Sequence, residues 1–481
     1  MAKTPNQLAT DCWKYLRRDR PTLRRFEAYY NGDQDIPHLV DSEDPECVQN
    51  GKASILNMMR MLVGLPAGML TVEGVRPGPD RGLSMDSSPE WKHWQRSEMD
   101  FFQKSVYRGA FTYGHAFVVT EIERGRATSR LLSPLNTSAV YVDPVNDLVP
   151  AAALHVINEP TSKTGGRAYL WTDTHRYDVI LPKTSTKLQN CRVDGDGVEH
   201  GATRCPVTRF AASLDVNGRT RGIVEMAMQP QDFLNLTRYH LLEASTNSHT
   251  PVRTITGVKF QTVNDPITGK PVVDERTGQV KKRPLRIRAR DVLQAEDKEA
   301  RFGLLSASPL DGHIKVVEMA MEQLAASLQA PGSATTGKMA NLSGEALTEA
   351  RRAETLKVDE FALLFGVSWK SVFRVAAELS GDEEGADDYE TRIVWRNNSG
   401  IAFGALVDGL VKLVVAGLPI EGIVDMVPVT ETQREEWRTM LRDAPSQVEG
   451  DADTETTDAL AAARSSAAER RAARLSGQSV A

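Results

Sequence analysis

A short polar segment between two amphipathic helices constrains the fold of this 481-residue chain more than any other feature. The first helix is predicted to start at Ser308-Pro309, where a hydroxyl cap precedes a proline at the first helical position. Its apolar residues recur at helical spacing and are Ile314, Val317, Met321, Leu324 and Leu328. Pro331-Gly332 ends this helix, and Ser343 caps a second, longer one whose apolar face runs to Leu379. The sequence therefore predicts a short loop with a single cation, held out between two helices.

That loop contains a near match to a phosphate-binding loop. Gly332, Gly337 and Lys338 have the spacing G-x-x-x-x-G-K, but Met339 stands where a hydroxyl is needed to hold magnesium. Such a loop should also follow a buried strand, whereas residues 324–328 are helix-like. A nucleotide-hydrolysing enzyme is therefore a weak alternative, which predicts ATP hydrolysis that is lost on Lys338→Ala.

Composition and cysteine spacing exclude several classes of protein. Hydrophobic residues make up 41% of the chain, and the net charge of −6 gives no reason to expect general coating of nucleic acid. There is no run of 18 apolar residues, and the N-terminus lacks the apolar segment of a signal peptide. The cysteines lie far apart without a C-x-x-C pair and are Cys12, Cys47, Cys191 and Cys205. We therefore expect reduced thiols, a cytoplasmic environment, and no metal or cofactor.

The N-terminal part reads as helices followed by strands. Helical patterns cover residues 8–31, with a second helix starting at Pro21, and then 53–70 and 91–113, separated by a connector over 33–52 and a loop over 74–88. Strands with a period of two are predicted at 115–120, 138–142, 152–156, 168–171 and 177–181. Their regular spacing favours an antiparallel sheet, so the chain is assigned to the α+β class. Residues 194–197, Asp-Gly-Asp-Gly, resemble the opening of a calcium loop, but a hairpin turn is the better interpretation.

A basic, turn-rich stretch separates a helix predicted over 230–245 from the helix that starts at Ser308. Between Arg276 and Arg290 there are seven cations and no acid: Arg276, Lys281, Lys282, Arg283, Arg286, Arg288 and Arg290. Two interpretations stay open, one face of an exposed hairpin or a docking surface for an acidic partner or a phosphate backbone. No aromatics interleave the cations, which weakens the case for specific single-strand binding. A monomeric nucleic-acid-binding protein that uses residues 276–290 remains an alternative.

The C-terminal part combines an acidic stretch over 381–390, a strand over 391–396 and helices over 401–417 and 430–442. From Asp443 to Ala463 the tail carries six acids and no base, and an alanine- and arginine-rich stretch follows. This composition is typical of a disordered segment, predicted here for residues 443–481.

Several short stretches occur in an order that is specific when taken together. They are LRRFEAYYNG at 23–32, AFTYGHAFV at 110–118, SP at 133–134, YVDP at 141–144, QDFLN at 231–235, PVR at 251–253, LSGEAL at 342–347 and VWRN at 394–397. Over roughly residues 10–440 the chain resembles the phage portal proteins of the long-tailed-phage type, represented by the Bacillus-phage portal.

The resemblance implies a ring, typically dodecameric, at one vertex of an icosahedral head, with a DNA tunnel through it. It divides the chain into wing (1–221 and 343–398), a stem of two helices (222–249 and 308–330), a small β-containing clip (250–307), a tunnel loop (331–342) and a helical crown (399–442). The clip insertion would explain why a basic module interrupts two amphipathic helices.

The resemblance also implies the roles of particular residues. The tunnel loop would place Lys338, with Thr335, Thr336 and Asn341, toward the phosphates of passing double-stranded DNA. The clip would dock the large subunit of the packaging terminase and later the head–tail adaptor through Lys281, Lys282, Arg283, Arg286, Arg288 and Arg290. Further partners would be the major capsid and scaffold proteins, with assembly in the bacterial cytoplasm, a final place in the virion and no membrane. No catalytic residue is expected, and a packaging ATPase is the least favoured alternative.

Overall fold

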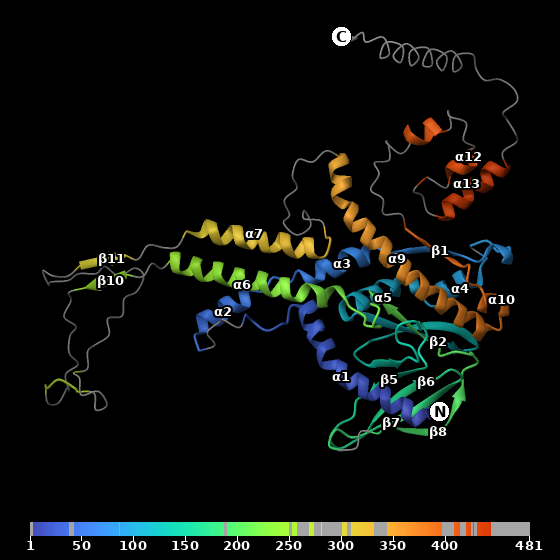
Figure 1. Ribbon diagram of the computed structural model, residues 1–481, viewed down its shortest axis with the longest axis horizontal. Helices are drawn as coiled ribbons and strands as arrows, with labels where there is room; N and C mark the ends of the chain where they lie inside the picture. Colours follow the sequence, from blue (N-terminus) through green and yellow to red (C-terminus); the bar gives the residue numbers. More distant parts are fainter. Residues whose placement is uncertain are drawn as a thin grey trace, which may run out of the picture. The chain divides into compact units, whose positions relative to one another are not determined.

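The structure is a computed structural model that describes residues 3–37, 43–85, 87–186, 190–249, 253–256, 269–273, 280, 301–304, 309–330, 344–396, 408–413, 420–424, 427 and 431–443. The chain divides into two compact units, Met1–Gly400 and Ile401–Ala481. The first unit mixes helices and strands (Figure 1), as expected for an α+β chain.

The helices of the first unit surround and connect its strands. They are α1 (Pro5–Asn31), α2 (Pro45–Ser54), α3 (Met59–Met69), the short 3₁₀ turn η1 (Pro79–Arg81), α4 (Pro89–Arg96), α5 (Met99–Tyr113), α6 (Ile223–His249), α7 (Leu310–Ser327), α9 (Gly344–Ser380) and α10 (Glu383–Ala386). The strands are β1 (Val72–Arg76), β2 (His115–Glu123), β3 (Arg126–Leu132), β4 (Thr137–Val140), β5 (Ala152–Asn158), β6 (Gly166–Trp171), β7 (His175–Leu181), β8 (Arg192–Glu199), β9 (Val207–Ala211), β10 (Arg253–Thr256), β11 (Arg301–Leu304) and β12 (Arg392–Trp395).

The strands pair antiparallel, as predicted, but they form several sheets rather than one, and the strand predicted at 115–120 lies in a different sheet from the other four. One sheet has the order β4-β5-β6-β7-β8 and another the order β3-β2-β9, while β1 pairs with β12 and β10 with β11. The prediction of a hairpin turn at residues 194–197 is wrong, because these residues lie inside β8. Gly195 and Gly197 have φ of 84° and 82°, and the pairing of β7 with β8 shifts register between Arg176 and Asp178. The glycines therefore supply a strand irregularity rather than a chain reversal.

Three predicted helix boundaries are also wrong. Pro21 does not start a new helix but lies inside α1, whose buried residues continue on both sides of it, from Cys12 to Phe26. This continuous buried face outweighs the backbone hydrogen bond that a proline removes. The helix predicted over 53–70 is instead α2 and α3, separated at residues 55–58, and the helix predicted over 91–113 breaks at Glu98, which has φ of 53°. The predicted loop over 74–88 contains part of β1.

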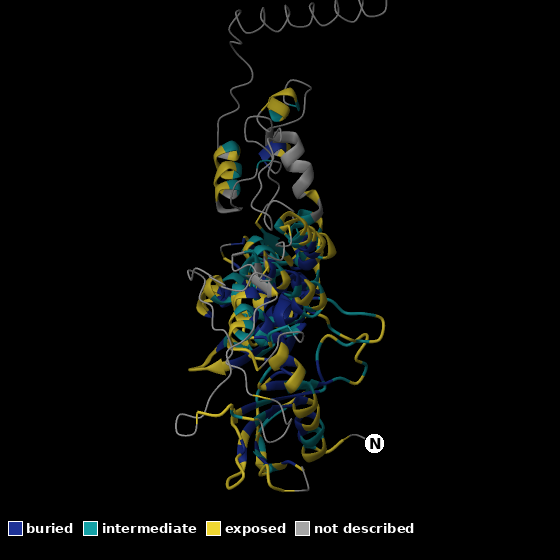
Figure 2. Ribbon diagram, turned by 90° about the vertical axis from the view of Figure 1, so that its left-hand side faces the viewer, coloured by how far each residue is buried: buried dark blue, intermediate teal, exposed yellow. Residues whose placement is uncertain are grey.

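The main core is built on α9, the longest described helix. Trp369 packs against Trp94 and Phe210 with ring centroids 4.8 and 4.6 Å apart, and Tyr107 stacks on Phe365 at 5.0 Å. The indole Nε1 of Trp369 donates a hydrogen bond of 2.9 Å to the Tyr107 hydroxyl. Aromatic residues of α4, α5, α9 and β9 therefore form the centre of this core, and Figure 2 shows buried residues gathered in the middle of this unit.

A second core lies where α1 crosses the five-stranded sheet. Cys12, Trp13 and Leu16 pack against residues of β5, β6 and β7, among them Leu154 and Leu170. Cys12, Cys191 and Cys205 are buried free thiols, and burial raises their pKa values. The Cys47 thiol is also free.

A buried ionic cluster joins η1 and α4 to the end of α9. The Arg81 guanidinium contacts Glu90 and lies 2.7 Å from Asp382 and 3.8 Å from Asp388. Asp388 also accepts hydrogen bonds from the backbone N–H of Gly78 and of Thr391. Burial opposes ionisation of Asp388, but these hydrogen bonds outweigh it and lower the pKa of this carboxyl group.

The second unit is helical in its described parts. Residues 408–413 are helical, and α12 (Ile420–Val424) and α13 (Glu431–Asp443) follow. The helix predicted over 430–442 is confirmed. Of the helix predicted over 401–417, the structure describes residues 408–413, and these are helical. Residues 444–481 of the tail predicted to be disordered lie outside the described residues.

Candidate functional site

All of the individually predicted site residues lie outside the described residues. This holds for the loop residues Thr335, Thr336, Lys338 and Asn341 and for the basic residues Lys281, Lys282, Arg283, Arg286, Arg288 and Arg290. What the structure describes is the framework on both sides of them.

Helices α6 and α7 lie side by side and run in opposite directions (Figure 1). Beyond their far ends, β10 pairs with β11 in a register that places Arg253 opposite Leu304 and Thr256 opposite Arg301. The basic insertion between Thr256 and Arg301 therefore leaves and re-enters the framework at one two-stranded ladder. Inside the insertion, Val273 and Val280 form an isolated antiparallel bridge.

Residues 50–57, which we call the polar clasp, hold the middle of α6 through hydrogen bonds. The Gln231 side-chain amide donates hydrogen bonds to the Leu56 carbonyl at 2.7 Å and to Asn235 Oδ1 at 2.9 Å. Asn235 Oδ1 also accepts from the backbone N–H of Leu56 at 3.2 Å. Both amide side chains are buried.

Further along α6 the polar clasp makes two more contacts. Arg238 donates a hydrogen bond of 3.0 Å to the Ser54 carbonyl, and Asn50 donates one of 2.8 Å to Glu243. The polar clasp therefore fixes α6 over about four turns, from Gln231 to Glu243. Sequence reasoning assigned residues 33–52 to a connector and missed this role, although QDFLN at 231–235 places Gln231 and Asn235 four residues apart, on one helical face.

The C-terminal half of α7 packs into the main core. Ala320 and Leu324 are buried there, and Val317, Met321 and Leu328 pack against it. Ile314, predicted to belong to the same apolar face, is instead 43% exposed, as are Val316 at 39% and Met319 at 43%. Ile314 and Val316 lie in the N-terminal half of α7 and Met319 lies at its middle, so apolar side chains of α7 are also exposed outside the core.

The segment that links α7 to α9 lies outside the described residues, apart from the turn in which it begins. Gln329, with φ of 56°, ends the turn after α7, and the described chain resumes at Gly344. A cavity of about 160 Å³ lies at the junction, lined by residues of α3, α6, α7 and α9 that include Lys357 and Phe361. The helices predicted on both sides of the loop are confirmed as α7 and α9, while residues 331–343 lie outside the described residues.

The helix pair α6 and α7 carries a net negative charge. Its acids are Glu225, Asp232, Glu243, Asp311, Glu318 and Glu322, and its bases are Arg238 and Lys315. Two bases and six acids give a formal charge of 2 − 6 = −4, with histidines neutral. Asp311 and Glu322 are exposed. A surface of this sign repels phosphates rather than holding them.

The surroundings of Gly332 do not match a nucleotide site. Helix α7 precedes the loop where a phosphate-binding loop needs a strand. Among the described residues, no group of three or more His, Cys, Asp or Glu side chains is placed to bind a metal. Within the same residues, no helix has the length and apolar character needed to cross a membrane.

Comparisons with known proteins agree with the resemblance inferred from the sequence. The sequence profile of the family described as "Phage portal protein, SPP1 Gp6-like" matches residues 10–448. The portal protein of Mycobacterium phage L5 is 23% identical over 410 residues, which cover 80% of this chain and 77% of that protein.

Chains in two solved particle structures align with this chain over most of its length. A chain in the virion of a native gene transfer agent particle aligns with a TM-score of 0.45 and 12% identity, covering 84% of this chain and 91% of its own length. A chain in the neck of an empty gene transfer agent particle aligns with a TM-score of 0.46 and 10% identity, covering 88% and 93%. On the profile match across most of its length, the chain belongs to the SPP1 Gp6-like family of phage portal proteins.

Proposed function

We propose that this chain forms a closed ring, typically of twelve copies, at the unique vertex of a phage head, and that double-stranded DNA enters and leaves the head through it. In this proposal the chain performs no catalysis of its own. It is assembled in the host cytoplasm with the major capsid and scaffold proteins and remains in the virion.

The proposal assigns parts of the chain to parts of the ring. Helices α6 and α7 are the stem (222–249 and 308–330), residues 250–307 are the clip, and residues 331–342 are the tunnel loop. The wing comprises residues 1–221 and 343–398, and the crown residues 399–442. The exposed apolar residues of α7, Ile314, Val316 and Met319, suit contact with a neighbouring copy, because a ring needs a surface on each copy that the next one covers.

The observation that carries the proposal is the net charge of the helix pair. A channel must let DNA slide, and each phosphate contact adds a salt-dependent attraction that a ring multiplies by its subunit count. Stem helices with a formal charge of −4 per copy keep that attraction low. Lys338 would then supply one modest positive contact per subunit. The cations of residues 281–290 would lie away from the channel, on the clip, where they bind the large terminase subunit and the head–tail adaptor.

Charge reversal on α7 tests this arrangement. The variant Asp311→Lys/Glu322→Lys removes two negative charges and adds two positive ones, which changes the net charge by +4 per copy. The control Asp194→Lys/Asp196→Lys makes the same change on exposed residues of β8. Binding of the assembled ring to a labelled duplex is measured against salt concentration. We expect the α7 variant to bind DNA more tightly, with a steeper salt dependence of about 0.9 in the log–log slope for each added phosphate contact. Equal behaviour of the two variants would contradict the placement of α7 at the channel.

Neutralising the basic insertion separates the proposal from its main rival. Changing Lys281, Lys282, Arg283, Arg286, Arg288 and Arg290 to glutamine should leave rings intact and weaken binding of the terminase large subunit. If the chain is instead a monomeric nucleic-acid-binding protein, the same change abolishes DNA binding by a monomer. ATP hydrolysis by the purified protein that disappears in Lys338→Ala would favour the packaging ATPase.

A further inference from the structure

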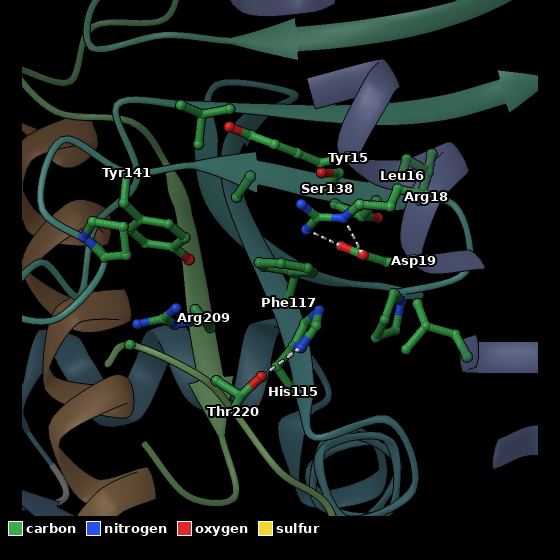
Figure 3. Close-up of a pocket in the computed structure, with 17 residues that line it drawn as sticks. Tyr15, Leu16, Arg18, Asp19, His115, Phe117, Ser138, Tyr141, Arg209 and Thr220 are labelled. Carbon is green, nitrogen blue, oxygen red and sulfur yellow. Dashed lines mark hydrogen bonds and ion pairs between the residues drawn. The ribbon is translucent and has the colours of Figure 1, made fainter. Parts of the chain in front are cut away.

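A cavity of about 360 Å³ lies beside β4, the edge strand of the five-stranded sheet (Figure 3). Residues of α1, β2, β4 and β9 line it, together with the segments that follow β4 and β9. One wall closes where Gly218, with φ of 75°, packs against Pro144; a Cβ on this glycine would lie 2.8 Å from the Pro144 carbonyl oxygen. Its volume is within the range of small-molecule sites, about 300–1,000 Å³.

Arg209 of β9 lines this cavity as a buried cation without an acidic partner. The residue is 7% exposed, and its guanidinium lies over the Tyr141 ring, 4.2 Å from the centroid. Within the described part of the chain, its side chain makes one hydrogen bond, from Nη2 to the Asp147 carbonyl at 3.5 Å. Among the described residues, no carboxylate forms an ion pair with it. A buried charge left in this way is costly unless a counter-ion reaches it.

The other ionisable side chains that line the cavity do not neutralise the positive charge of Arg209. Arg18 and Asp19 form an ion pair of 2.7 Å and neutralise each other. Burial, assisted by the nearby Arg209, lowers the pKa of His115 to about 4, although Asp19 acts in the opposite direction, so this imidazole is neutral at pH 7. Its Nδ1 is hydrogen-bonded to the Thr220 hydroxyl at 3.1 Å. The cavity therefore has one net positive charge.

Tyr141 supplies a second unsatisfied group. Its hydroxyl is buried and has no hydrogen-bond partner among the residues that the structure describes, which leaves one O–H donor available. Figure 3 shows Tyr141 and Arg209 on one side of the cavity, the Arg18–Asp19 pair on the other, and Phe117 and His115 between them. A donor and a cation thus share one side of a space that is also lined by aromatic rings.

We propose that this cavity binds the carboxylate of an organic monoacid, with the Arg209 guanidinium and the Tyr141 hydroxyl as its donors. A planar carboxylate matches the fork of a guanidinium, and its single negative charge matches the single positive charge of the cavity. A phosphate monoester carries about −1.5 to −2 at pH 7 and fits this charge less well. The remaining volume accommodates an apolar body against Phe117 and Tyr15.

Calorimetric titration of the assembled full-length protein tests the proposal, with sodium benzoate, inorganic phosphate and acetyl-Ala-Glu-Ala-amide as probes at constant ionic strength. Benzoate represents a free organic acid and the peptide represents an acidic side chain of a polypeptide. We expect one of these carboxylates to bind more tightly than phosphate, and the tighter of the two identifies the source. Loss of the charge-assisted donor in Arg209→Gln should weaken binding about tenfold or more.

Two further variants keep the test decisive. Tyr141→Phe removes a hydroxyl that has no partner, so the protein should fold as before while the carboxylate binds several-fold more weakly. Arg167→Gln removes an exposed cation of β6, outside the cavity, and should leave binding unchanged. Failure of both carboxylates to bind, tighter binding of phosphate, or equal affinity in wild type and Tyr141→Phe would each overturn the proposal.

Discussion

Replacing Asn235 by alanine should release α6 from the polar clasp. Asn235 is 3% exposed, and its Oδ1 accepts from both the Leu56 backbone N–H and the Gln231 side chain. The substitution leaves these two donors unsatisfied, at roughly 1–3 kcal/mol each. Alanine returns roughly 0.6 kcal/mol as the better helix former. The two donors together cost roughly 2–6 kcal/mol, so the opening free energy of α6 should fall by about 1–5 kcal/mol.

Amide hydrogen exchange of residues 228–240 measures this opening free energy directly, because exchange reports local opening below the global unfolding transition. Asn217→Ala is the matched control, since Asn217 lies in an exposed turn and its side chain makes no hydrogen bond among the described residues. A loss in Asn235→Ala of no more than about 0.5 kcal/mol, the usual range for surface substitutions, would refute the assignment of residues 50–57 as the anchor of α6.

Two further predictions concern buried charge. Arg81→Met should destabilise the first unit by about 3–5 kcal/mol in denaturant unfolding at pH 7, because Glu90, Asp382 and Asp388 lose their common cation. Because hydrogen bonds lower the pKa of Asp388, this loss should shrink only at pH values below the ordinary range of an aspartate, and a loss that stays constant across pH would contradict this reasoning. His93 is buried, with Nδ1 donating to the Ala127 carbonyl and Nε2 accepting from Ser129, and burial lowers its pKa from 6.5 to about 4. The unfolded chain binds a proton at His93 more readily than the folded chain does. The stability contributed by neutral His93 is therefore complete above pH 6.5 and is lost as the pH falls toward 4, by at most about 3 kcal/mol. His93→Gln should flatten this part of the pH–stability curve, and an unchanged slope would show that other groups cause it.

The spacing of apolar residues along the sequence predicted the helices and strands whose apolar face is buried in the core. The apolar face of α9 is buried at Phe361, Phe365 and Val372, as its helical spacing indicated. The antiparallel pairing of short strands followed from their period of two. Both patterns are local, and the core that buries them reinforces the local preference.

The sequence did not predict structural features that depend on contacts with residues far away along the chain. Residues 72–76 form a strand because β12, more than 300 residues later, pairs with them. The break between α2 and α3 exists because Leu56 bonds to α6 instead of continuing a helix. No sequence pattern marked Arg209 as unpaired, since the absence of a partner is a property of the folded neighbourhood. The roles predicted for Lys338 and for residues 281–290 remain predictions, because these residues lie outside the described part of the chain.

The central claim is that this chain assembles into a ring with a DNA channel. Its most direct test is the mass of the purified full-length protein by light scattering, together with negative-stain images of the same sample. The account predicts closed rings with a central hole and a mass near twelve times the 53.0 kDa chain. A protein that stays monomeric in the presence of its capsid and scaffold partners, and that hydrolyses ATP through Lys338, would contradict it.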